Sequence, residues 1–130
     1  MIADPIMVME RLDELSRELD RLSKELGETE RELVPVEEAY EKALDVFECG
    51  CWDRHVKDDA KLPSGEMRLR LARREMNTKL LGQHASLLAK RKRLEKRIGS
   101  VKSLVEAQRS ILSALKLEAE AAGTGLRRAA

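Results

Sequence analysis

Apolar residues recur at alternating steps of three and four along the first part of the chain, and this repeat constrains the fold more than any other feature. Its positions are Val8, Leu12, Leu15, Leu19, Leu22, Leu26, Thr29, Leu33, Val36, Tyr40, Ala43 and Phe47. A spacing that averages about 3.5 residues over about five heptads is typical of helices that supercoil around one another. The sequence therefore predicts a long amphipathic helix with a helical partner.

Polar residues and prolines mark the course of this first helix. Asp4 can cap it, and Pro5 suits its first position, where the amide that proline lacks would have no helical partner. Pro35 lies inside the repeat, but the repeat continues across it. We therefore expect a kink at Pro35 and not a stop.

A second apolar seam lies in the last part of the chain. It passes through Leu87, Leu94, Ile98, Val101, Val105, Leu112 and Leu115, with His84, Arg91 and Gln108 in the same register. Ser64 can cap the helix that carries this seam, and Gly123 and Gly125 favour its end near Ala122. The predicted organisation is a single helical-hairpin domain over 1–122, with helices over 5–48 and 64–122, a connection over 49–63 and a disordered tail over 123–130.

Charge divides the chain into two opposite halves. Residues 1–66 hold 9 Lys+Arg and 19 Asp+Glu, a net charge of −10, whereas residues 67–130 hold 16 and 5, a net charge of +11. Such segments attract each other, and antiparallel pairing lets their flanking acids and bases meet. With 38% charged and only 2% aromatic residues, leucine must carry the packing. We expect an all-α fold, a long antiparallel coiled-coil helical hairpin.

The second seam is wider than a strict heptad stripe, because Leu88, Leu104 and Ile111 flank it. A wide stripe is typical of a helix that touches more than one neighbour. Two helices alone also bury little surface. We therefore expect homodimerisation of two hairpins into a four-helix assembly.

Cys49, Cys51 and His55 form a C-x-C-x3-H cluster in the expected connection and are weak candidates for metal ligands. Sulfur and imidazole suit zinc, but structural zinc sites take four ligands and the sequence has no second half-site. Cysteines one residue apart are also poorly placed to bridge each other. Packing as small apolar groups is the simpler expectation, so we predict no metal and no cofactor.

The three aromatic residues, Tyr40, Phe47 and Trp52, fall within thirteen positions near the end of the first helix. They can fill the hairpin tip, where the helices splay apart. Trp and Tyr also dominate the energetic hot spots of protein interfaces. Together with His55, these residues are the candidate partner-binding site.

Basic side chains of the second helix offer an alternative, the binding of a nucleic-acid backbone. The candidate residues are Arg70, Arg73, Arg74, Lys90, Arg91, Arg93 and Arg97. A helix spreads such charges around its circumference, and no aromatic residue lies among them to stack on a base. Pairing with the acidic half is the simpler expectation.

Several function classes lack support in the sequence. It contains no glycine-rich phosphate loop, no HExxH and no GxSxG motif, so we expect a non-catalytic protein. It has no apolar run of the roughly 20 residues that a membrane helix needs, so we expect no membrane association. The start also lacks the basic and apolar regions of an export signal, which favours the cytoplasm.

The segments 62–70 (LPSGEMRLR) and 108–116 (QRSILSALK) carry a resemblance to a known group. The chain resembles small phage and prophage helical-hairpin proteins of unassigned function, often encoded beside recombination or replication genes. The resemblance implies a phage-type interaction protein in the host cytoplasm, acting through self-association and partner binding at the hairpin tip. An accessory nucleic-acid-binding protein in recombination or replication, and an assembly or scaffold factor, are the alternatives.

Overall fold

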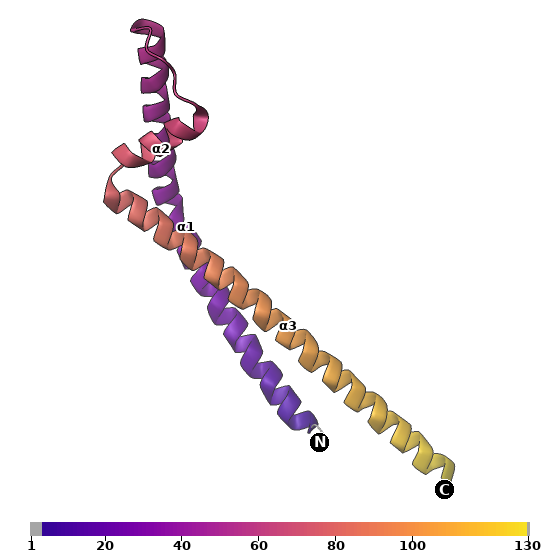
Figure 1. The fold of residues 1–130 in the computed structure, drawn as a ribbon. Helices are drawn as coiled ribbons and strands as arrows, with labels where there is room; N and C mark the ends of the chain where they lie inside the picture. Colours follow the sequence, from indigo (N-terminus) through magenta and orange to yellow (C-terminus); the bar gives the residue numbers. More distant parts are fainter. Residues whose placement is uncertain (1–3, 130) are drawn as a thin grey trace. The chain divides into compact units, whose positions relative to one another are not determined.

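The computed structural model describes residues 4–129, those from 124 onward by their backbone alone, and this part of the chain holds three helices and no strand. The helices are α1 (Pro5–Lys57), α2 (Gly65–Glu75) and α3 (Thr78–Ala129), as Figure 1 shows. The two long helices pack against each other. The predicted all-α class is therefore confirmed.

The chain divides into two compact units. The first comprises Met1–Leu26 and Arg93–Ala130, and the second comprises Gly27–Lys92. The first unit therefore pairs the start of α1 with most of α3, whereas the second contains the rest of α1, all of α2 and the start of α3.

The core of the first unit is built from the two predicted seams. Leu15, Leu22, Leu94 and Val101 form its buried cluster, and Leu19, Leu26, Ile98 and Val105 pack against it. Leu15 is 1% exposed and Val101 is fully buried. Each such side chain contributes about 1.5–3 kcal/mol through its removal from water. The spacing of the apolar residues thus determines which helix faces meet.

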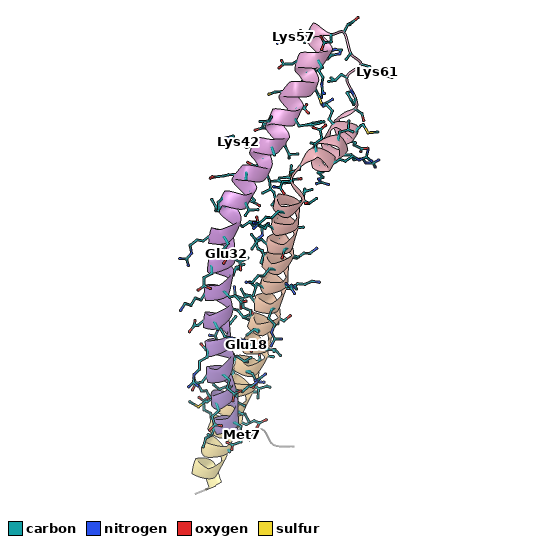
Figure 2. All side chains as sticks on the ribbon, turned by 90° about the vertical axis from the view of Figure 1, so that its left-hand side faces the viewer. Met7, Glu18, Glu32, Lys42, Lys57 and Lys61 are labelled. Carbon is teal, nitrogen blue, oxygen red and sulfur yellow. The ribbon has the colours of Figure 1, made fainter. Side chains whose placement is uncertain are left out.

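An ion pair between the acidic and basic halves lies beside this core. Arg97 donates from Nε and Nη2 to Oε1 of Glu18, at 3.0 and 2.6 Å. Figure 2 shows Glu18 on the side of α1 that faces α3. Arg97 is thus engaged by an acid of the same chain.

α1 begins as the sequence predicts and ends later. The carboxylate of Asp4 accepts a hydrogen bond from the Ile6 amide at 3.0 Å, and the helix starts at Pro5. Pro35 lies inside α1 and does not stop it. The predicted end at residue 48 is wrong, because the helix continues to Lys57 through most of the predicted connection. Cys51 is buried four residues after Phe47, so the apolar repeat extends into this segment.

The predicted second helix is interrupted. Ser64 caps α2 as expected, with its hydroxyl accepting from the Met67 amide at 3.3 Å. The prediction of one helix over 64–122 is wrong, because α2 ends at Glu75 and α3 begins at Thr78. Asn77 caps the new helix, its side-chain oxygen accepting from the Lys79 amide at 2.9 Å.

α3 also ends later than predicted. It continues past Gly123 and Gly125 to Ala129, so the predicted helix end near Ala122 is wrong, and the backbone of 123–129 is helical where we expected a disordered tail. A glycine costs a helix only about 1 kcal/mol, which does not by itself end one. Ala130 lies outside the described residues.

Candidate functional site

Trp52 lies at the centre of a polar cluster near the end of α1, in the second unit. Its indole N–H donates to Oε1 of Glu48 at 3.0 Å, and the guanidinium of Arg68 lies 5.7 Å from its ring centroid. Arg68 in turn donates from Nε to both carboxylate oxygens of Glu48, each at 2.9 Å, and from Nη1 to the Pro63 carbonyl at 2.7 Å. One arginine therefore joins α1, α2 and the segment between them.

The cluster changes the acidity of its carboxylate. The hydrogen bond from Arg68 lowers the pKa of Glu48 below its usual value, and the hydrogen bond from the Trp52 indole lowers it further. Both donors stabilise the ionised form. The site therefore keeps a negative charge at Glu48 into acidic conditions.

His55 lies near the end of α1 and contacts the segment that follows the helix. Its Nδ1 lies 2.7 Å from the carbonyl oxygen of Ala60, the geometry of a ring N–H that donates to this carbonyl. The Ala60 amide donates back to the Arg54 carbonyl at 3.4 Å, and Asp59 takes a left-handed conformation with φ 53°. The His55 ring also meets Trp52 edge-on, with centroids 6.0 Å apart. His55 therefore links the chain reversal to the Trp52 cluster.

Tyr40 belongs to a second polar cluster of the same unit. Its ring stacks on the His84 imidazole, with centroids 4.2 Å apart and planes 17° from parallel. Its hydroxyl accepts from Nε of Arg73 at 3.0 Å, and Nε2 of His84 lies 4.0 Å from Oε1 of Glu37. Residues from all three helices thus meet around one tyrosine.

An open groove with a volume of about 400 Å³ lies between α1 and α2. Its lining residues are Ala39, Lys42, Ala43, Val46, Phe47, Ala72, Glu75 and Met76. Phe47 also lines two smaller hollows of about 210 and 140 Å³ in the same unit. Phe47 therefore borders all three hollows, and the groove exposes mainly apolar surface beside it.

The four predicted partner-binding residues all lie in the second unit but not in one cluster. Trp52 and His55 are in ring contact, Tyr40 belongs to the cluster around His84, and Phe47 borders the groove. Sequence reasoning missed Glu48, although it precedes Trp52 by four residues, a spacing that brings side chains together on a helix. Arg68 gave no such signal, because its contact depends on the path of the chain between α1 and α2.

Four of the seven predicted nucleic-acid-binding residues have interactions within the chain. Arg97 pairs with Glu18, and Arg73 donates to Tyr40. Lys90 and Arg91 are half-buried and have interactions of their own. The exposed members of the set are Arg70, Arg73, Arg74, Arg93 and Arg97. Of the seven candidates, Arg70, Arg74 and Arg93 are therefore the ones that are both exposed and without a described contact.

The three weak metal candidates do not share one face of α1, because Cys49 and Cys51 are two residues apart on the helix. Cys49 is exposed and Cys51 is buried, and both are free thiols. One ring nitrogen of His55 is engaged by the Ala60 carbonyl. Within residues 4–129 no three His, Cys, Asp or Glu side chains gather in the way a metal ion would need.

Comparison with models of protein families, with curated proteins and with solved structures finds no match to this chain. The likeness to phage hairpin proteins therefore stays a prediction from the residues that carry it. Across the part of the chain that the structure describes, no helix combines the length and the apolar character needed to cross a bilayer.

Proposed function

We propose that this protein is a non-catalytic helical interaction protein that self-associates and binds a partner protein at the end of α1. The observation that carries this proposal is the state of Trp52, which is held by Glu48, Arg68 and His55 and is still 46% exposed. Ordering a side chain at an interface costs about 0.5–1.5 kcal/mol, and a tryptophan that is already held in place avoids much of this cost.

The surroundings of Trp52 indicate the chemistry of the partner. Val56 lies one turn further along α1, shares a face with Trp52 and is 76% exposed. Asp45 and Asp53 are exposed on neighbouring positions of the same helix. Arg54 and Lys57 are exposed on the same part of the helix, so an apolar centre among charges of both signs fits a partner that offers an apolar pocket with a polar rim.

We further propose that the long helices form an antiparallel coiled-coil hairpin and that two hairpins assemble. Within the second unit, Glu37 of α1 lies beside His84, whereas the later residue Glu48 pairs with the earlier residue Arg68. Arg68 belongs to α2 and His84 to α3, so a partner number that falls as the α1 number rises supports a chain that runs back along α1, as a hairpin requires. The buried seams at Leu15 and Val101 support the coiled-coil register.

The proposal is tested by capture of partners with the purified protein as bait. Trp52→Ala removes the aromatic anchor and leaves the Glu48–Arg68 pair in place, so we expect it to recover at least about tenfold less partner, a loss typical of an interface hot spot. Val34→Ala is the matched control, because Val34 is 55% exposed on α1 in the same unit and lies outside the cluster. Circular dichroism must show equal helicity for both variants. Equal recovery by wild type and Trp52→Ala would overturn the proposal.

The exposure of Arg70 and Arg74, one turn apart on α2, favours the alternative of an accessory nucleic-acid binder. Phosphate contacts make such binding fall steeply with salt. A gel-shift assay with single- and double-stranded DNA at low ionic strength decides this alternative. No shift removes it, whereas a shift that Arg70→Ala and Arg74→Ala weaken would favour it over partner-protein binding.

A further inference from the structure

An apolar ridge on α1 borders the groove between α1 and α2, and no part of the described chain covers it. Ala39, Ala43 and Val46 follow one another along one face of α1, at steps of four and three residues. Val46 is 66% exposed, although it lies next to the half-buried Phe47. Ala43 also belongs to the apolar repeat of α1, whereas Ala39 and Val46 are exposed beside that repeat.

The small residues of the ridge allow another helix to come close. Helices pack at axial distances of about 8–10 Å, and the shorter distances need small side chains at the contact. The alanines Ala39 and Ala43 on α1 and Ala72 on α2 line the groove on both sides. The groove therefore has room for a protruding apolar side chain such as Val46 itself.

The charges at the groove complement each other. Lys42 lines it from α1 and Glu75 lines it from α2. In the described part of the chain, neither of the two takes part in an ion pair or a side-chain hydrogen bond. A groove with one free cation on one wall and one free anion on the other can match a second copy of itself.

We propose that this groove is the surface through which two copies of the chain associate, which rests on the proposed self-association. A two-fold axis along the groove places α1 of each copy opposite α2 of the other, because an isologous interface exchanges its two sides. Val46 of each copy then enters the groove of the other. Lys42 of each copy pairs with Glu75 of the partner copy, in the flanking positions that usually set partner choice.

This assignment differs from the sequence-based expectation about the surface of α3. Leu104 and Ile111 widen the seam of α3, and they are 41% and 39% exposed. Both side chains are less exposed than Val46, which is 66% exposed. The dimer therefore depends on the α1–α2 groove and not on the outer face of α3.

The test measures the mass of the full-length protein by sedimentation equilibrium. Lys42→Glu and Glu75→Lys each place like charges at both contacts of the dimer, so each variant alone should dissociate at least about tenfold more readily. An equimolar mixture of the two variants restores opposite charges at both contacts and should form a heterodimer. Rescue by mixing distinguishes an interaction between copies from one within a single chain.

Matched controls separate this inference from the proposed self-association. Glu41→Lys and Lys79→Glu reverse exposed charges that do not line the groove, and we expect wild-type dimers from both, and also from the double variant Leu104→Ala/Ile111→Ala. A monomeric wild-type protein would overturn both proposals. A dimer that survives Lys42→Glu and Glu75→Lys, or that mixing fails to restore, would overturn the groove assignment alone.

Discussion

Arg68 holds Glu48 through both carboxylate oxygens, at 2.9 Å each, although the two residues lie on different helices. The arginine is 18% exposed and the glutamate 42%, so the pair lies at the edge of the α1–α2 contact. Because Arg68 also donates to the Pro63 carbonyl and faces Trp52, it fixes the site that we propose for partner binding.

The stability of the protein should depend on the ionisation of Glu48. The Arg68 hydrogen bond lowers its pKa in the folded state below the usual 4.5, so the unfolded state binds the proton more readily. The contribution of the pair is therefore fully present above the usual value and is lost as the pH falls through the lowered one. Carbon-detected NMR titration should place the Glu48 midpoint below 4.5. A midpoint at or above this value in the folded protein would contradict the geometry.

Asp59→Gly should stabilise the protein by about 0.5–1 kcal/mol, because glycine adopts a positive φ without the steric cost of a side chain. Asp59 has φ 53° and is the only non-glycine residue with a positive φ in the described part of the chain. Urea unfolding followed by circular dichroism measures the change. Asp58→Gly is the control. If it stabilises the protein as much as Asp59→Gly does, the positive φ of Asp59 is not the cause of the gain.

Gly99→Ala should stabilise α3 by about 1 kcal/mol, the difference in helix propensity between the two residues. A Cβ atom added at Gly99 meets no atom within 4 Å, so no contact opposes the gain. The neighbouring exchange Ser100→Gly should lower the melting temperature while Gly99→Ala raises it. Thermal unfolding of both variants should show changes in melting temperature of opposite sign.

Leu15→Ala should destabilise the first unit by about 2–5 kcal/mol, the cost of emptying a buried leucine position. Leu15 is 1% exposed and belongs to the cluster with Leu22, Leu94 and Val101. Leu104→Ala removes the same atoms from a side chain that is 41% exposed, and should cost under about 1 kcal/mol. Chemical unfolding measures the two changes. Similar losses in the free energy of unfolding for both variants would mean that Leu15 does not belong to the core.

The helix faces could be predicted from the sequence because they depend on local spacing. Every position of the first repeat from Val8 to Phe47 is buried or half-buried, and so is every position of the second seam from His84 to Leu115. The caps at Asp4 and Ser64 were also predictable, because a polar side chain before a helical segment satisfies its free amides.

The helix boundaries and the contacts of the candidate site were harder to predict, for different reasons. The extension of α1 to Lys57 had a signal in Cys51, which continues the repeat by four residues, but Gly50 outweighed it. The start of α3 had a signal in Asn77, a good capping residue that stands beside a run of charges. The groove and the Arg68 contacts had none, because they depend on how α2 packs against α1, which no local spacing encodes.

The mass of the protein in solution tests the central claim, that this chain is an interaction protein acting through self-association. Sedimentation equilibrium or light scattering at micromolar concentration should give twice the chain mass of 14.7 kDa. A mass that stays at 14.7 kDa throughout this range would contradict the account.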